Sequence, residues 1–158
     1  RNYRNDSSNN ANNFVEGIKF FSSDGREIIN YPKVHIQNGI NKNNNTQRTY
    51  KRTVRLYKRI RNHMKDNGIN VPDGIRSFLL EGLLWNVPNS IFFNNNTWNQ
   101  ILRESIVWLY QNTNTDEACK DWGEVSEYFY LFHSGRKWNR AEVRDFLVQM
   151  WNYLGYTS

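Results

Sequence analysis

The stretch TQRTYKRTVRLYKRIRNHMKDNG, residues 46–68, carries the strongest structural signal in this chain. Its apolar side chains recur at helical spacing, at Tyr50, Val54, Tyr57, Ile60 and Met64. Thr46 is a suitable N-cap, and Gly68 follows as a stop signal. The stretch therefore predicts an amphipathic helix over residues 46–67, with one face buried.

The remaining faces of that helix are densely basic. They carry Arg48, Lys51, Arg52, Arg55, Lys58, Arg59, Arg61 and Lys65. Such a density is unfavourable unless anions meet it. Lys51, Arg55 and Lys58 are separated by four and three residues, so they share one flank that can grip a phosphate chain. A solvated basic face, paired with acids from elsewhere, explains the pattern equally well.

Four further helices are predicted downstream. Capping boxes start two of them, Thr97 with Gln100 and Asn139 with Glu142, while Pro88 ends another. The predicted segments are residues 73–88, 97–109, 124–132 and 139–155. The first of these is apolar on most sides, which indicates a mostly buried helix.

The amino-terminal region has a different pattern. Residues 14–21 and 26–29 are apolar and flank an Asp24-Gly25 turn, which predicts a hairpin. Residues 30–45 contain Pro32, Gly39 and many Asn, so an ordered loop is expected there. The fold class predicted is mainly α, a bundle of about five helices with a small β-hairpin near the amino terminus.

Composition limits the classes of function. A length of 158 residues fits one compact domain, and a net charge of +6 favours a polyanionic partner. Cys119 stands alone, which excludes an internal disulfide and indicates an inert, semi-buried thiol. No apolar run is long enough to cross a membrane, so a cytoplasmic protein is expected. Because the first residue is Arg, we expect further sequence upstream.

The sequence lacks the motifs of a complete active site. It contains no Asp-x-Asp pair for two metal ions, no phosphate-binding P-loop and no nucleophile elbow. Glu124 with Glu127, and Glu142 with Asp145, are expected on solvated helix faces. His35, His63 and His133 are scattered along the chain and support no metal site.

The start of the second predicted helix offers a different kind of site. Helix N-termini present free amides to anions, and Ser77 adds a hydroxyl there. Phe78 offers a ring on which a base can stack. By pattern alone, Phe78 is more often a core residue and Ser77 a neutral surface residue.

Several blocks together resemble the carboxy-terminal half of bacterial cGAS/DncV-like nucleotidyltransferases. They are VEGI at 15–18, NYPKVH at 30–35, Asn38-Gly39, Lys42-Asn43, Thr46, YKRTVRLYK at 50–58, IRSFLLE at 75–81 and LWNVP at 84–88. The resemblance extends from about residue 14 to the last predicted helix. It implies a two-lobed enzyme that makes cyclic oligonucleotide second messengers from nucleoside triphosphates in anti-phage defence.

In such enzymes an amino-terminal palm lobe carries the Gly-Ser loop and the Mg²⁺-binding carboxylates. A helical lobe holds the triphosphate with a Lys on the long helix and a Ser at the start of the next, followed by an aromatic residue, usually Tyr, that stacks on the base. By resemblance these roles fall on Lys58, Ser77 and Phe78. Because Phe stands in place of the usual Tyr, the ring has no hydroxyl to bond with the base. Lys51 and Arg55 are secondary phosphate candidates, and Lys42 is a weaker one on the expected loop.

The resemblance therefore makes residues 1–45 a junction with the palm lobe and residues 46–158 the helical nucleotide-binding lobe. Without the Gly-Ser loop and the carboxylates, which this sequence lacks, we expect no catalytic residue, no Mg²⁺ ligand and no synthase activity in the isolated chain. The expected partners are nucleoside triphosphates and the palm lobe. A basic module that binds nucleic acid is the alternative, and a purely structural helical domain is a third reading.

Overall fold

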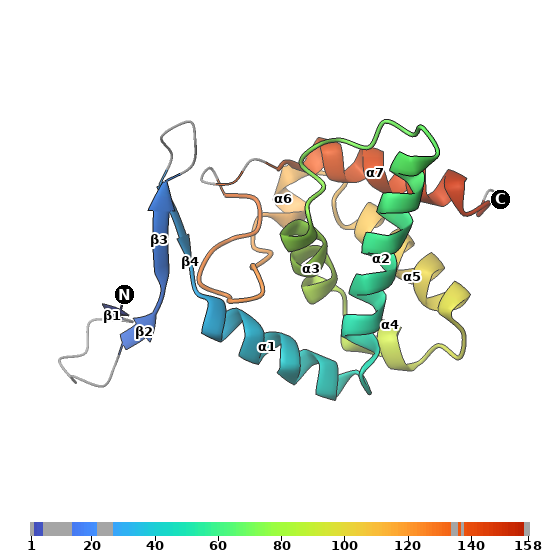
Figure 1. Ribbon diagram of the computed structural model, residues 1–158. Helices are drawn as coiled ribbons and strands as arrows, with labels where there is room; N and C mark the ends of the chain where they lie inside the picture. The colour runs from blue at the N-terminus through green and yellow to red at the C-terminus, as the bar shows by residue number, and fades with distance from the viewer. Residues whose placement is uncertain (1, 5–13, 22–26, 134–135, 137, 157–158) are drawn as a thin grey trace.

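The computed structural model describes residues 2–4, 14–21, 27–133, 136 and 138–156. Across them the chain forms four short strands followed by seven helices (Figure 1). The predicted fold class, mainly helical with a small β element in front, is confirmed. Within the described residues, no helix combines the length and hydropathy that a membrane crossing requires.

The strands make two antiparallel pairs. They are β1 (Asn2–Arg4) with β2 (Phe14–Glu16), and β3 (Ile18–Phe21) with β4 (Glu27–Asn30). The second pair, in the register Ile18 to Asn30, is the predicted hairpin. The Asp24-Gly25 turn lies outside the described residues. The single strand expected over 14–21 is divided at Gly17, because its two halves pair with different partners.

The helices follow in sequence order. They are α1 (Pro32–Asn45), α2 (Thr49–Asp66), α3 (Ser77–Asn86), α4 (Asn89–Phe93), α5 (Trp98–Gln111), α6 (Asp116–Cys119) and α7 (Arg140–Tyr153). Figure 1 shows α2 crossing the middle of the molecule, α1 leading from the hairpin to the start of α2, and α5 and α7 on the side away from the hairpin.

Helix α1 occupies the segment that was expected to be a loop, so that prediction is wrong. Pro32 stands at the first helical position, where its fixed φ suits a helix and its missing N–H is not needed. Gly39 is buried within the helix rather than in a turn. Residues that usually break helices are here compatible with one, which the composition of the segment did not reveal.

The junction of α1 and α2 also differs from the prediction. Thr46 ends α1, and two residues with positive φ, Gln47 and Arg48, precede the start of α2 at Thr49. The Thr46 hydroxyl donates to the Lys42 carbonyl and accepts from the Tyr50 amide, both within 3.0 Å. Thr46 therefore bonds to an amide of the first turn of α2 without being its N-cap.

The core lies around the apolar face of α2, as the periodicity predicts. Tyr57 and Met64 are fully buried, and the Tyr57 hydroxyl bonds with Ser105 of α5. Helix α3 is buried along most of its length. The capping predictions at Thr97 and Asn139 are confirmed, since each side chain accepts a bond from the amide three residues later. Cys119 is buried, and burial raises the pKa of its thiol.

Residues 124–132 do not form the predicted helix. They fold back as a loop with a single antiparallel bridge between Gly123 and Tyr130 and a positive φ at Glu127. Glu124 is only 1% exposed, and its oxygens accept bonds from Arg136 at 2.6 and 2.9 Å. A buried carboxylate requires such pairing. The expectation that Glu124 lies on a solvated helix face is therefore wrong.

Candidate functional site

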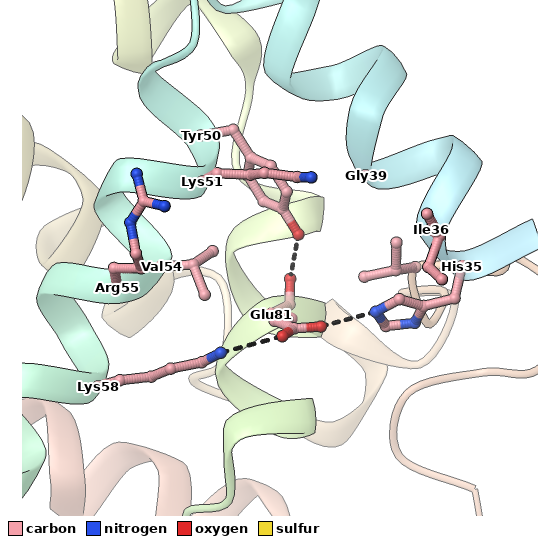
Figure 2. Close-up of a pocket in the computed structure, with 10 residues that line it drawn as sticks. His35, Ile36, Gly39, Tyr50, Lys51, Val54, Arg55, Lys58 and Glu81 are labelled. Atoms are coloured by element: carbon pink, nitrogen blue, oxygen red, sulfur yellow. Dashed lines mark hydrogen bonds and ion pairs between the residues drawn. The ribbon is translucent and has the colours of Figure 1, made fainter. Parts of the chain in front are cut away.

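A pocket of about 300 Å³ lies between α1, α2 and α3 (Figure 2). Its polar lining includes His35 from α1, Lys51, Arg55 and Lys58 from α2, and Glu81 from α3. The three cations of the predicted α2 flank are therefore brought together. The described lining contains three cationic side chains and one carboxylate, so it has an excess of positive charge.

Gly39 leaves space for this pocket. It lies on α1 facing α2, and a Cβ atom placed on it would be 4.0 Å from Cε of Lys51. Apart from its chain neighbours and the backbone of its own helix, no heavy atom of the described residues comes closer than that. A larger side chain at this position would occupy space between the two helices, so a glycine here keeps the pocket open.

Glu81 connects the three helices at the floor of the pocket. Its Oε1 lies 3.1 Å from the Lys58 ammonium, and its Oε2 lies 2.6 Å from Nε2 of His35. The Tyr50 hydroxyl donates to the main-chain oxygen of Glu81 at 2.9 Å. Burial alone would raise the pKa of Glu81, but the bonds from His35 and Lys58 outweigh it and lower that pKa. The carboxylate is thus held in its charged form.

Lys51 and Arg55 differ from Lys58 in their surroundings. Both are exposed, and neither forms an ion pair with a carboxylate of the described residues. Figure 2 shows the Lys51 side chain extending across the pocket toward α1 and that of Arg55 lying beside α2. Their charges are available to an anion without breaking an existing pair.

Phe78 lies in a neighbouring hollow of about 250 Å³, which shares His35 with the first pocket. The Phe78 ring stacks on the His35 imidazole with centroids 5.4 Å apart, and the Arg136 guanidinium lies 4.7 Å from the ring centroid. Tyr31 also lines this hollow. A planar ligand that enters there meets several rings rather than Phe78 alone.

Ser77 lines neither hollow. It is the first residue of α3 and half-buried, and its hydroxyl oxygen lies 3.5 Å from a guanidinium nitrogen of Arg61. The same guanidinium donates to the Ile75 carbonyl at 3.1 Å. Arg61 thereby ties the start of α3 to α2. Ser77 is close to the basic helix, as predicted, but it does not share a cavity with Lys51 and Arg55.

Lys42 is placed on α1, not on a loop, and it faces away from the pocket. Its ammonium donates to the Val87 carbonyl at 2.9 Å and to Asn89 at 2.7 Å. The Tyr50, Trp85 and Phe92 rings surround it at 5.3–5.7 Å. Lys42 is only 7% exposed, and burial lowers its pKa to about 8. This environment leaves the Lys42 ammonium buried and engaged, which does not suit a phosphate ligand.

Two residues of the pocket, His35 and Glu81, received no role from the sequence. Glu81 lies four residues after Ser77, which places both on one face of α3. His35 lies four residues before Gly39 on α1. Recognition of α1 as a helix would have placed His35 beside Gly39, but Pro32 favoured the loop prediction instead.

No three His, Cys, Asp or Glu side chains come together as a metal site within the described part of the chain. In the pocket itself Glu81 is engaged by His35 and Lys58. These residues do not fit a bound Mg²⁺ ion. The chemistry available to the described pocket is that of its cations and rings, namely binding and orienting an anion.

Comparison with known proteins shows which proteins this chain resembles. Residues 37–155 match the family model of the cGAS/DncV-like nucleotidyltransferase C-terminal helical domain. The chain is 53% identical over 144 residues to a cyclic dipyrimidine nucleotide synthase CdnE from Cecembia lonarensis, covering 91% of this chain and 49% of the relative. It is 40% identical over 142 residues to a cyclic dipurine nucleotide synthase from Elizabethkingia meningoseptica, covering 90% and 47% respectively.

Solved structures of CdnE synthases are also similar to this chain. The Elizabethkingia meningoseptica CdnE cyclic dinucleotide synthase with GTP and Apcpp superposes with a TM-score of 0.81 at 39% identity, over 90% of this chain and 51% of that one. The Rhodothermus marinus CdnE c-UMP-AMP synthase with Apcpp and Upnpp gives 0.80 at 29% identity, over 99% and 53%. The chain spans about half the length of the relatives it matches.

Proposed function

Since the chain belongs to the family of cGAS/DncV-like nucleotidyltransferase C-terminal helical domains, we propose that its pocket between α1, α2 and α3 holds the phosphates of a nucleoside triphosphate. Lys58 is the principal phosphate ligand in this proposal, and Lys51 and Arg55 assist it. The supporting observation is the excess of cations over carboxylates in one pocket. Structures of relatives with GTP, Apcpp or Upnpp support the ligand class.

The base of the nucleotide occupies the neighbouring hollow, where Phe78 and His35 form a stacking platform. The two hollows adjoin, since both are lined by His35 and Ile36, and in this proposal the ligand extends from the cations of the first to the rings of the second. Ser77 lines neither hollow, so its part in the proposal is limited to the amino end of α3, whose free amides and nearby Arg61 favour a phosphate oxygen beside the pocket. These are the roles that the family resemblance assigned to Lys58, Ser77 and Phe78.

In the whole enzyme, this half works with a palm lobe that carries the metal-binding carboxylates. The product is a cyclic oligonucleotide, made for anti-phage signalling in the bacterial cytoplasm. Two-metal nucleotidyl transfer requires carboxylates that bridge the ions. The isolated chain is therefore expected to bind nucleotide without making product. Product formed from ATP and GTP with Mg²⁺ by the purified 158-residue chain would contradict this part of the proposal.

Calorimetric titration of the chain with ATP tests the binding proposal. We expect saturable binding that Lys58→Ala weakens about 30-fold, because a charge-assisted bond to phosphate contributes about 2 kcal/mol. Lys65→Ala is the matched control, since Lys65 is an exposed lysine of α2 outside the pocket. Equal losses of ATP affinity in the two variants would show that binding depends only on the general charge of the helix.

A second function is favoured by the adjacent flank of α2, which shares Arg55 with the first pocket. Arg52, Arg55 and Arg59 are exposed there and surround a hollow of about 510 Å³ together with the 43%-exposed Trp98. No described carboxylate lines this hollow. Guanidinium groups beside an exposed ring suit a single-stranded polynucleotide, with phosphates on the arginines and a base on the indole. We propose this outer stripe, defined by Arg52, Arg55, Arg59 and Trp98, as a candidate polynucleotide surface.

Fluorescence titration with a 20-nucleotide single strand, as RNA and as DNA, tests the second function. The expected affinity falls with salt, and Trp98→Ala weakens it about fivefold, because stacking on an aromatic ring contributes about 1–3 kcal/mol. ATP binding should not change in this variant, since Trp98 lies outside the first pocket. Polynucleotide binding that is unaffected by Trp98→Ala would contradict a role for the outer stripe.

A further inference from the structure

Glu81 places a negative charge in a pocket proposed to bind a polyanion. It is the one carboxylate among the described lining residues, and its side chain is 28% exposed. Like charges repel, so an anion site normally avoids a carboxylate. The contacts of Glu81 offer a physical reason for its presence.

Each of the three oxygen atoms of Glu81 contacts a different side chain. Oε1 accepts from Lys58 of α2, Oε2 bonds with His35 of α1, and the main-chain oxygen accepts from Tyr50. Figure 2 shows these three contacts converging on Glu81 at the floor of the pocket. The side chains that it holds come from the two helices that form the opposite walls.

The contact with Lys58 fixes a side chain that is otherwise flexible. A free lysine loses about 2 kcal/mol of rotamer entropy when a ligand immobilises it. Lys58 is already held by Glu81 before any ligand arrives, whereas Lys51 and Arg55 have no described carboxylate partner. Preorganisation of this kind increases affinity by lowering the ordering cost of binding.

The contact with His35 extends to the second hollow. The His35 ring bonds to Glu81 through Nε2 at 2.6 Å and stacks on Phe78 at 5.4 Å. It lines both hollows. Glu81 therefore fixes one member of the ring platform as well as the principal ammonium group.

We propose that Glu81 is a positioning residue for nucleotide binding. Its carboxylate holds Lys58 toward the phosphates and holds His35 against Phe78, and this gain exceeds the repulsion between Glu81 and the triphosphate. The inference rests on the proposed nucleotide site. By charge alone, removal of the Glu81 carboxylate would strengthen the binding of an anion. The positioning role predicts the opposite, that its removal weakens binding.

The test compares Glu81→Gln with Glu117→Gln by calorimetric titration with ATP. Glu117 is an exposed acid of α6, so its variant makes the same change in net charge outside the pocket. We expect Glu81→Gln to weaken ATP binding fivefold to tenfold and Glu117→Gln to leave it unchanged. In a Lys58→Met background, Glu81→Gln should have a smaller effect, because the ammonium that it positions is gone. Circular dichroism checks that each variant is folded.

A second readout follows Lys58 without any nucleotide. In ¹⁵N-labelled chain at low temperature, an ammonium held by a carboxylate exchanges its protons slowly enough to give a side-chain signal. That signal should be present for Lys58 in the unaltered chain and absent in Glu81→Gln. A signal that persists in the variant would contradict the proposal that Glu81 holds Lys58. This result counts even if the variant folds poorly enough to complicate calorimetry.

The outcomes separate the two claims. Equal or tighter ATP binding by folded Glu81→Gln would overturn the positioning role and leave the nucleotide site intact. No ATP binding by the unaltered chain would overturn the proposed function itself, and with it the purpose assigned to Glu81. Weaker binding together with loss of the Lys58 signal supports the inference.

Discussion

The two flanks of α2 carry the same kinds of residue in different surroundings. The inner flank is the one that lines the pocket between α1, α2 and α3. There Lys58 faces α3, and both Lys58 and His35 contact the Glu81 carboxylate. On the outer flank, Arg52 and Arg59 are exposed and form no ion pair with a described carboxylate. The inner flank has walls formed by α1 and α3, whereas the hollow at the outer stripe is lined by the four stripe residues and Leu56.

The contrast indicates that the neighbours of a basic helix determine its ligand. A walled pocket with one fixed ammonium suits a compact anion of defined shape, such as a triphosphate. An open row of arginines beside an indole suits a long, flexible polyanion, whose binding depends on salt. Both flanks are basic, and they differ in packing and in the share of lysine and arginine.

Closing the inner pocket should separate the flanks most strongly. Gly39→Leu places a branched side chain between α1 and α2, where a glycine leaves space beside Lys51. We expect ATP affinity to fall at least 30-fold while polynucleotide binding is kept. Thermal unfolding should show equal or higher stability, because glycine in a helix interior costs about 1 kcal/mol relative to better helix formers.

Equal loss of both ligands in Gly39→Leu would contradict the separation of the flanks. Gly39→Ala is the control, since its single methyl group makes only ordinary contact with Lys51. It should raise stability with little change in ATP affinity.

Removal of the outer arginines should have the reverse effect. In Arg52→Ala/Arg59→Ala, we expect polynucleotide affinity to fall about tenfold. The slope of log affinity against log salt should become shallower by about 1.4, because each phosphate contact to a single strand contributes about 0.7. ATP affinity should stay within about twofold. Fluorescence titration at several salt concentrations measures the slope, and an unchanged slope would show that the strand binds elsewhere.

The ring platform gives a smaller, more selective effect. Phe78→Leu keeps the bulk of the side chain beside His35 but removes the aromatic face. We expect ATP binding to weaken about fivefold, since base stacking on an aromatic residue contributes about 1–3 kcal/mol. Inorganic triphosphate has no base, so its affinity should not change. Calorimetry with both ligands tests this, and equal weakening of the two would argue against a base in the second hollow.

Lys42 supplies the smallest effect, on stability alone. Its pKa is lowered to about 8 in the folded chain by burial, while the unfolded value is near 10.5. Between these values the unfolded state binds more protons, so the free energy of unfolding rises with pH in that window. From pH 7.5 to 9, the unaltered chain should gain about 1 kcal/mol relative to Lys42→Met. Urea unfolding at both pH values measures this, and a constant difference would contradict the buried ammonium.

The helical core could be predicted from the sequence because its signals are local. The apolar positions of α2 recur at helical spacing, and Thr97 and Asn139 mark helix starts through bonds to amides three residues away. Such signals need no knowledge of the rest of the fold. The resemblance of several blocks to one family was correct for a similar reason, since it used the order of motifs along the chain.

The failures involve contacts between distant residues. Pro32 and Gly39 argued against a helix, although the first fits a helix start and the second faces α2. Lys42 was expected to bind phosphate, but its ammonium bonds with Val87 and Asn89, which are distant in the sequence. Glu124 was expected to be solvated, but it is buried and accepts a bond from Arg136. Composition indicated the charges correctly but could not show which of them are buried or paired.

The proposed function requires that the inner pocket, not the outer stripe, binds the triphosphate. Titration of ¹⁵N-labelled chain with ATP, followed by two-dimensional NMR, locates the ligand. We expect the largest shifts at His35, Lys58 and Glu81, while the indole signal of Trp98 stays unchanged. Shifts centred on Arg52, Arg59 and Trp98, with the inner pocket unaffected, would contradict the proposal.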